Sequence, residues 1–384
     1  MRTLALRLPS PRRGRNEEGV ILDFFSTPIL TLRQSSGQAL SPSRGKEQEN
    51  NLMNKSFRTA ILATLIVSTI ASPAPAATKV SFPYTPIGIA SWPWWIARDG
   101  GYFDKHGLDV DMIYVGASPV IVQAMLGGQA GVGAGGGTPL VTNVLQGGDV
   151  VQVATMVPYA IQSLIVRSDI RTTKELAGKK IGVSRLGAIP HFTLQAIAKL
   201  YNVQGINVVQ TGTTAQGFAT LSQGLIDGII TSAPFTFRLI KDGYRELVSP
   251  KDFKKLNFEF LINGLVARRS FGAKNREIVV AMIKATMEGT KRMFTDEKFA
   301  KNILAKYTRQ NEAEVLDQSY RFALDIMVKD PTVTASSIQP IVQQAAEWNQ
   351  IDAKLAASTP TSAYYDNSYI EEIKKSGFFA QLWR

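Results

Sequence analysis

The stretch LDVDMIYVGASPVIVQAMLGGQAGVGAGGGTP, residues 108–139, decides the fold class. It begins with alternating apolar and polar residues over Leu108–Val115, a pattern typical of a half-buried strand. A glycine loop then leads into a helical segment, Pro119–Leu126, which ends at Gly127 and Gly128. A short strand, Gly131–Ala134, follows. Strand, loop, helix and strand in this order predict a βαβ unit, and therefore an α/β fold with parallel sheets.

The same order of elements continues on both sides of this stretch. Before it, the sequence predicts a strand and a helix at 79–84 and 93–99; after it, a helix and a strand at 139–145 and 150–156. The order restarts near residue 174, with strands at 180–184, 207–210 and 228–231 and helices at 190–201 and 215–223. From Asn275 the pattern is largely helical, at 276–295, 312–327 and 337–356, and we expect these helices to pack back on the first half.

An internal similarity favours two lobes of one design. Ala124–Gln129 and Ala219–Gly224 each combine a helix end with a glycine stop, and each precedes a short strand. Two unrelated βα turns would explain the similarity equally simply, because such units are common.

Composition narrows the class of protein. Hydrophobic residues make up 45% and charged residues 19% of the 384 residues, which is enough to build two globular domains. Cysteine is absent, so disulfides, thiolate metal sites, a cysteine nucleophile and a lipid anchor on an N-terminal cysteine are excluded. The net charge is +12, but the basic residues are scattered, so we expect no nucleic-acid partner.

Residues 53–76 predict a cleavable secretory signal. Lys55 and Arg58 form a basic start, Ala60–Ala71 is an apolar core too short to span a bilayer comfortably, and Ala74-Pro75-Ala76 supplies small residues for cleavage before Ala77. A retained membrane anchor is the alternative. Residues 1–52 do not fit before such a signal, so we interpret Met53 as the true start. We expect residues 1–76 to be disordered or removed.

Glycine-bearing loops follow several predicted strands and lead into helix starts. Ser118 and Thr138 stand where they would cap helices whose first residues are Pro119 and Pro139. In open α/β sheets the ligand binds at the carboxyl ends of the strands, where free N–H groups of helix starts favour an electron-rich group. Each cap also has a simpler explanation, which is that it only begins its helix.

Aromatic and charged residues near these loops suggest further contacts. A planar or partly apolar ligand could stack on Trp92 or Tyr159, whereas Trp94 and Trp95 are expected in the core. Arg185 is either a clamp for an anionic ligand or a surface arginine.

Signals for catalysis and for metals are weak. The two histidines, His106 and His191, have no evident co-ligands, so we expect no metal and no cofactor. Residues 131–136 spell G-x-G-x-x-G, but they follow the third predicted strand and not the first, which argues against a dinucleotide site. We therefore expect a protein without catalytic residues that is not an enzyme.

Three motifs in order resemble one known family. GYFDKHGLDV at residues 101–110, LAGKKIGV at 176–183, and GLIDG at 224–228 with Ser232-Ala233-Pro234 are similar to motifs of the nitrate/sulfonate/taurine-type periplasmic binding proteins, which group with the NMT1/THI5-like proteins. The resemblance covers residues 77–384.

The resemblance implies a type II periplasmic-binding-protein fold, with two βαβ lobes around a central cleft and a hinge of two chain crossings. The implied parts are lobe 1 at 77–163, lobe 2 at 164–266, and a return to lobe 1 with C-terminal helices at 267–384. The crossings are expected near Ser163–Arg167 and Asn263–Arg268. The implied ligand-facing residues are Ser91, Trp92, Ser118, Gly137, Thr138, Tyr159, Ser184, Arg185, Thr213 and Pro234.

The function implied by the resemblance is the periplasmic solute-binding component of an ABC importer. We expect a monomer that captures a small sulfonate, taurine, nitrate or pyrimidine-like ligand and delivers it to an inner-membrane permease. A THI5-like pyrimidine-precursor enzyme and a ligand-sensing periplasmic lobe are the alternatives. Export argues against the first, and the absence of a signalling segment argues against the second.

Overall fold

The computed structural model describes residues 76–255 and 259–384, and all of them belong to one contact unit, Pro73–Arg384. The predicted extension at 1–52 and the predicted signal peptide, except for its last residue, lie outside the described residues. No helix in the described part of the chain is long and apolar enough to cross a membrane.

Two small sheets form around the first half of the chain. β1 (Thr78–Tyr84) and β2 (Leu108–Tyr114) pair in parallel over their whole lengths. In the second sheet, β10 (Glu259–Arg268) lies between β3 (Val132–Gly135) and β4 (Val150–Tyr159) and is antiparallel to both. The central strand of this sheet therefore comes from a much later part of the sequence. These sheets and the helices packed on them are lobe 1.

The middle of the chain forms one five-stranded sheet, which with its helices is lobe 2. Its strands are β5 (Ser163–Val166), β6 (Lys180–Val183), β7 (Asn207–Gln210), β8 (Gly228–Thr231) and β9 (Arg245–Val248), in the spatial order β7-β6-β8-β5-β9. β6 is parallel to β7 and β8, as predicted, whereas β5 is antiparallel to β8 and β9. In each lobe, one strand that follows a link between the lobes lies between two others and is antiparallel to both: β10 in lobe 1 and β5 in lobe 2. This shared arrangement supports two lobes of one design.

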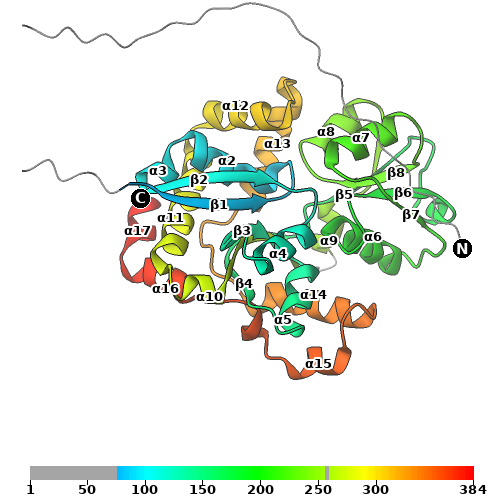
Figure 1. Ribbon diagram of the computed structural model, residues 1–384. Helices are drawn as coiled ribbons and strands as arrows, with labels where there is room; N and C mark the ends of the chain where they lie inside the picture. The colour runs from blue at the N-terminus through cyan, green and yellow to red at the C-terminus, as the bar shows by residue number, and fades with distance from the viewer. Residues whose placement is uncertain (1–75, 256–258) are drawn as a thin grey trace, which may run out of the picture. The chain divides into compact units, whose positions relative to one another are not determined.

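Helices follow the parallel strands of both lobes. In lobe 2, α7 and α8 lie on one face of the sheet and α6 on the other (Figure 1). The helices there are η2 (Thr173–Leu176), α6 (Ile189–Leu200), α7 (Thr214–Ser222), α8 (Phe235–Lys241) and α9 (Pro250–Lys255). In lobe 1 they are η1 (Ile89–Ser91), α2 (Trp92–Asp99), α3 (Tyr102–Lys105), α4 (Ser118–Leu126) and α5 (Thr138–Leu145).

The two links between the lobes lie slightly earlier in the sequence than predicted. β4 ends at Tyr159 and β5 begins at Ser163, so the first link is 160–162 and not 163–167. The second prediction, 263–268, was wrong as a link, because Gly264–Ala267 are already paired with β3 and β4 in the lobe 1 sheet. The chain returns to lobe 1 before these residues.

The core of lobe 1 contains the tryptophans of α2. Trp92, Trp94 and Trp95 are all fully buried, which confirms the prediction for the last two. α2 packs on α11 (Arg276–Thr295), and a Cβ added at Gly289 would lie only 2.5 Å from the carbonyl oxygen of Pro93. The two helices can therefore approach this closely only with glycine at position 289.

The helical pattern predicted after Asn275 is confirmed, and these helices pack mainly on lobe 1. The remaining helices are α10 (Arg269–Gly272), α12 (Glu297–Thr308), α13 (Ala313–Ile326), α14 (Ala335–Glu347), α15 (Ala353–Ser358), η3 (Thr361–Tyr364), α16 (Ser368–Lys375) and α17 (Phe378–Leu382). The helix predicted at 337–356 is two helices, because Asn349 between them has a left-handed φ of 55°.

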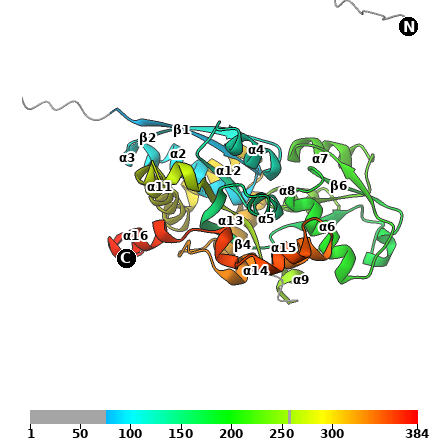
Figure 2. The ribbon, with the colours of Figure 1, turned by 60° about the horizontal axis from the view of Figure 1, so that its bottom comes forward.

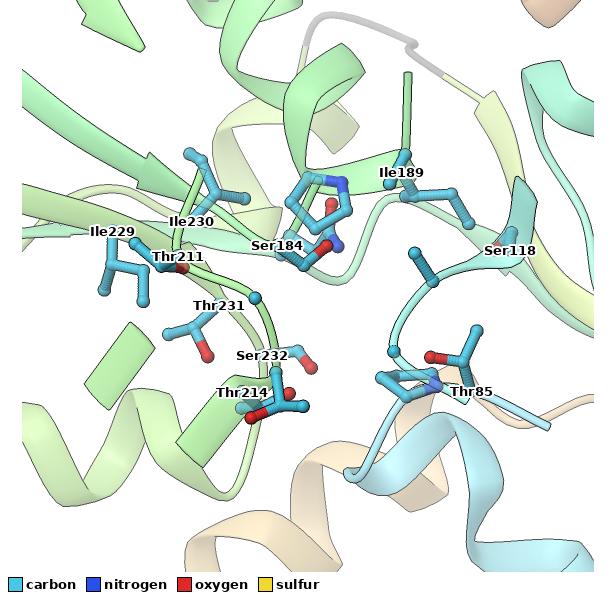
Figure 3. A pocket seen from close by; sticks show the side chains of 18 of the residues that line it. Thr85, Ser118, Ser184, Ile189, Thr211, Thr214, Ile229, Ile230, Thr231 and Ser232 are labelled. Atoms are coloured by element: carbon cyan, nitrogen blue, oxygen red, sulfur yellow. The ribbon is translucent and has the colours of Figure 1, made fainter. Parts of the chain in front are cut away.

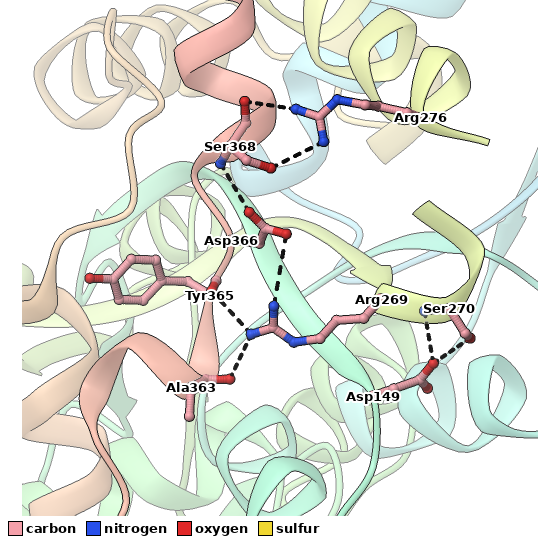
Figure 4. A network of polar contacts seen from close by, with 8 residues as sticks. All are labelled: Asp149, Arg269, Ser270, Arg276, Ala363, Tyr365, Asp366 and Ser368. Atoms are coloured by element: carbon pink, nitrogen blue, oxygen red, sulfur yellow. Dashed lines mark hydrogen bonds and ion pairs between the residues drawn. The ribbon is translucent and has the colours of Figure 1, made fainter. Parts of the chain in front are cut away.

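Polar contacts fix the C-terminal segment to lobe 1 (Figure 4). Arg269 donates from Nη2 to the carbonyl oxygens of Ala363 and Tyr365, at 3.0 and 3.2 Å. Arg276 donates from Nη2 to the carbonyl oxygen of Ser368, at 2.9 Å. The segment after α15 is therefore held by the first residues of α10 and α11.

Candidate functional site

A cavity of about 70 Å³ lies between loops of the two lobes (Figure 3). We call it the cleft cavity. Lobe 1 contributes the loops after β1 and β2, and lobe 2 contributes the loops after β6, β7 and β8. Gln162 of the first link and Asn263 of β10 also line it, and Asn263 donates from Nδ2 to the carbonyl oxygen of Thr85, at 3.1 Å. The cavity therefore lies where the chain passes from one lobe to the other.

Hydroxyl and amide side chains supply the polar lining of the cleft cavity. They are Thr85, Ser118, Gln162, Ser184, Thr211, Thr213, Thr214, Thr231, Ser232 and Asn263. None of the described residues that line the cavity has a charged or aromatic side chain. The wall can donate and accept hydrogen bonds but supplies no formal charge. It fits an uncharged ligand, or an anion whose charge is spread over several oxygens.

Three helices begin at the cleft cavity: α4 at Ser118, α6 at Ile189 and α7 at Thr214. The first N–H groups of a helix lack partners within the helix and carry partial positive charge. At α7 the cap Thr213 accepts a hydrogen bond at Oγ1 from the N–H of Gln216, at 3.3 Å. The helix starts thus make the cavity mildly electropositive without any cationic side chain.

A larger cavity of about 460 Å³ is lined by α4, α5, the start of α6, residues 186–187 and Gln350. We call it the side cavity. Its one titratable side chain among the described lining residues is His191, whose Nδ1 accepts a hydrogen bond from the N–H of Gly187, at 3.1 Å. Burial lowers the pKa of His191 below its usual value. The imidazole is therefore held neutral at neutral pH.

Neither a catalytic arrangement nor a metal site is evident among the described residues. The lining hydroxyls of the cleft cavity have no histidine, carboxylate or lysine beside them in that lining to act as a general base. Across residues 76–255 and 259–384, no three His, Asp or Glu side chains are grouped so that they could hold a metal ion.

A family model described as NMT1/THI5 like matches residues 90–300, more than half of the chain. The chain belongs to the NMT1/THI5-like family. The match runs from η1 in lobe 1 through β4, continues through all of lobe 2, and ends after β10 and α11 at the start of α12. The resemblance read from the motifs is therefore confirmed. No curated protein matches the sequence closely enough to add to this assignment.

Solved structures similar to this NMT1/THI5-like chain include two binding proteins. The alkanesulfonate-binding protein SsuA from Xanthomonas axonopodis pv. citri, bound to MOPS, is 16% identical, with coverage of 77% of this chain and 100% of that chain and a TM-score of 0.62. The periplasmic nitrate-binding protein NrtA from Synechocystis PCC 6803 is 12% identical, with coverage of 79% and 90% and a TM-score of 0.64. These similarities show the type II periplasmic-binding-protein fold, as predicted.

Three of the predicted ligand-facing residues of this NMT1/THI5-like protein meet at the cleft cavity. Ser118 comes from lobe 1, and Ser184 and Thr213 come from lobe 2. Ser184 directly follows β6, Thr213 comes three residues after β7, and Ser118 is the first residue of α4, four residues after β2. All three lie in segments that the sequence singled out. The structure thus brings residues from three separate loops and both lobes to one place.

Two predicted residues, Ser91 and Trp92, lie in the interior of lobe 1 and not at the cavity. Both are fully buried. Ser91 donates from Oγ to the carbonyl oxygen of Pro86, at 2.6 Å, and Trp92 donates from Nε1 to the carbonyl oxygen of Ala300, at 2.9 Å. The expectation of ligand stacking on Trp92 was wrong, because α12 covers this tryptophan and takes its hydrogen bond.

Gly137 and Thr138 lie at the start of α5, near the boundary between the two cavities. Thr138 lines the side cavity and is buried. Gly137 has φ 71° and ψ −160°, a conformation that is nearly restricted to glycine, and a Cβ added there would lie 3.1 Å from Cγ1 of Ile189. Gly137 therefore faces a side chain of lobe 2.

The other three predicted residues lie outside the lining of the cleft cavity. Tyr159 is 45% exposed at the end of β4, and Arg185 is exposed in the loop after β6. Pro234 is buried before α8, and Ser232, two residues earlier, lines the cavity in its place. Since Arg185 does not line the cavity, the surface alternative for this residue agrees with the structure.

Sequence reasoning missed several lining residues, and they fall into two groups. The first group is close in sequence to predicted residues: Thr211 to Thr213, and Thr231 and Ser232 to Pro234. The sequence therefore identified the right strand ends but not every lining residue there. Gln162 and Asn263 line the cavity because they lie at the first link and in β10. The only sequence feature that could have indicated them is that both are polar residues near the predicted chain crossings.

Proposed function

We propose that this protein is the solute-binding component of an ABC importer, which captures a small organic ligand between its two lobes and delivers it to a membrane permease. The observation that carries this proposal is the cleft cavity, an uncharged, hydroxyl-rich space built from loops of both lobes beside the first link. A ligand there would contact both lobes at once, so its binding would favour a closed arrangement over an open one.

The proposed ligand is compact and rich in hydrogen-bond acceptors. Hydroxyls, amides and three helix starts suit the oxygens of a sulfonate, a nitrate or a carboxylate, or the polar edge of a pyrimidine. SsuA and NrtA, which share the fold, are named for an alkanesulfonate and a nitrate. We propose Ser118, Ser184, Thr213, Gln162 and Asn263 as the principal contacts.

In this proposal the protein is not an enzyme. It acts after export through the signal at residues 53–76, as a monomer in the periplasm, and docks on its permease in the closed form. The lack of a general base beside the lining hydroxyls supports binding without turnover. Conversion of any bound ligand by the purified protein would overturn this part of the proposal.

The direct test is a melting screen of the purified protein against small sulfonates, nitrate, carboxylates and pyrimidines. A true ligand at one hundred times its Kd stabilises the folded state by about 2.7 kcal/mol, which raises Tm by several degrees. Calorimetry then gives the Kd, and small-angle scattering with the same ligand should show a smaller radius of gyration. Absence of any stabilisation over the whole screen would count against a solute-binding role.

Two neighbouring substitutions locate the binding site within this experiment. Ser184→Leu fills the cleft cavity and removes a hydroxyl, so we expect at least a tenfold loss of affinity, or about 1.4 kcal/mol. Arg185→Leu introduces the same side chain one residue later, outside the lining, and should change the Kd by less than about twofold. The reverse result would restore Arg185 as an anion clamp and would reject the cleft cavity as the site.

A further inference from the structure

We propose that Ile189 sets the upper limit on the length of the ligand, because its side chain separates the cleft cavity from the side cavity. The proposal rests on the proposed function, since it concerns which members of a ligand class the same site accepts. In this proposal, one residue of lobe 2 determines whether the site accepts only compact ligands or extended ones as well.

The separation is a contact between the two lobes. Ile189, the first residue of α6, lines the cleft cavity and is 8% exposed. Its Cγ1 and Cδ1 lie 3.1 and 3.6 Å from where a Cβ of Gly137 would stand. The backbone of Gly137 is in a conformation that almost requires glycine, so no side chain from lobe 1 competes for this space. The isoleucine therefore rests directly on the main chain of the β3–α5 loop.

Neighbouring residues on the same segments show that the partition is one layer thick. Ile189 and Pro190 line the cleft cavity, whereas Gly187 and His191, on either side of them in the sequence, line the side cavity. In lobe 1, Ser118 lines the cleft cavity and the next residue, Pro119, lines the side cavity. Removal of one side chain at this boundary is thus enough to join the two spaces.

The side cavity has the size and chemistry to receive the tail of a longer ligand. Its volume is about 460 Å³, against about 70 Å³ for the cleft cavity. Val122, Leu126, Leu186 and Phe192 contribute apolar surface, and none of the described lining residues is a lysine, arginine, aspartate or glutamate. An alkyl chain could enter without burying a charge. With Ile189 in place this space is separated from the cleft cavity.

The test uses straight-chain 1-alkanesulfonates, from methanesulfonate to octanesulfonate, as probes in calorimetry. For the wild-type protein we expect the short alkanesulfonates to bind. The affinity should fall by at least about tenfold once the alkyl chain is too long for the cleft cavity. For Ile189→Ala we expect the fall to disappear, with affinity rising about fourfold for each further methylene that enters the side cavity.

The matched control is Ile230→Ala. Ile230 is a buried isoleucine of β8 that also lines the cleft cavity, and Figure 3 shows it on the other side of the cavity from Ile189. The substitution removes the same atoms and enlarges the cavity but leaves the partition intact. Melting and circular dichroism of both variants establish that each is folded before titration. If Ile189→Ala is too unstable to titrate, Ile189→Val, which shortens the same contact, takes its place.

The outcomes separate the two proposals. If both variants keep the wild-type length limit, or if Ile230→Ala extends it as far as Ile189→Ala does, the partition is rejected while the solute-binding function stands. If no sulfonate binds any of the three proteins, and no other ligand of the screen does, the solute-binding function fails, and the partition fails with it.

Discussion

At the scale of a single residue, His191 of the side cavity makes the stability of the fold depend on pH. Its Nδ1 accepts a hydrogen bond from the N–H of Gly187, which requires that nitrogen to be unprotonated. Burial lowers its pKa, whereas in the unfolded chain it titrates near the ordinary value of about 6.5. Between these two values the unfolded state binds more protons than the folded state. The contribution of His191 to stability is therefore complete above about pH 6.5 and is lost as the pH falls through the lowered pKa.

We predict that His191→Asn removes this part of the pH dependence. Asparagine keeps an acceptor for the Gly187 N–H but does not titrate. Chemical unfolding of both proteins at a series of pH values should give curves that run parallel above about pH 6.5 and diverge below it, with the wild type losing more stability. Curves that stay parallel through the acidic range would show that His191 is not held neutral.

The chemistry of single loops was predictable, whereas the burial of single aromatics was not. Ser118, Ser184 and Thr213 come soon after strand ends, and local sequence was enough to place them at the edge of the sheets where they line the cleft cavity. Trp92 also follows a strand, but its surroundings come from α12, and its partner Ala300 is about two hundred residues away in the sequence. A local sequence pattern contains no information about such a distant neighbour. It therefore cannot distinguish a buried tryptophan from one that stacks on a ligand.

At the scale of elements, a contact between α6 and the end of α14 joins the lobes away from the two links. Phe192 stacks on Trp348 with a ring-centroid distance of 6.0 Å and an interplanar angle of 5°. Gln350 donates from Nε2 to Oε1 of Gln195, at 3.0 Å, and Lys199 forms an ion pair with Glu347. The three residues of α6 lie three and four positions apart in the sequence and therefore on one face of the helix. Figure 2 shows α6 beside the segment that contains α14 and α15. If the lobes open and close as proposed, we expect this face of α6 to influence how far they open.

We predict that Trp348→Leu weakens ligand binding from a position outside the cleft cavity. Leucine keeps apolar bulk but loses the stacked pair, which is worth about 0.5–1.5 kcal/mol, so the Kd should rise by about two- to tenfold. Scattering of the free protein should show a larger radius of gyration. Lys199→Ala removes only an exposed ion pair of the same interface and should change the Kd by less than about twofold. Equal effects of the two substitutions would reject a specific role for the stacked rings.

Regular elements were predicted well wherever strand and helix alternate. β1, β2, β6, β7 and β8 lie within a residue or two of the expected ranges, and so do the helices after the first four of them, because glycine and proline mark their ends. The helix after β8 was not predicted. From the sequence, β5, β9 and β10 were not predicted as strands. β5 and β10 are antiparallel insertions, and they become strands only because a sheet formed elsewhere in the chain pairs with them.

At the scale of the whole molecule, pairing between strands that are distant in the sequence explains why the links between the lobes were not predicted correctly. The fold class was predictable because it depends on the order of the elements. Two βαβ series with similar endings indicate two similar lobes. The register with which β10 enters the lobe 1 sheet depends on pairing with β3 and β4, more than a hundred residues earlier. A pattern in residues 263–268 could show a strand but not its partners, so the predicted crossing fell inside the strand itself.

The place of β10 also has a consequence for the order in which the chain acquires its structure during synthesis. Every strand of lobe 2 has emerged once residue 248 is available, but β3 and β4 still lack the strand that joins them. The later lobe in the sequence can therefore be finished first, while the earlier one waits with open strand edges. A chain stopped after residue 255 should accordingly show slow amide exchange in β5 to β9 and rapid exchange in β3 and β4, and equal protection of both would contradict this order.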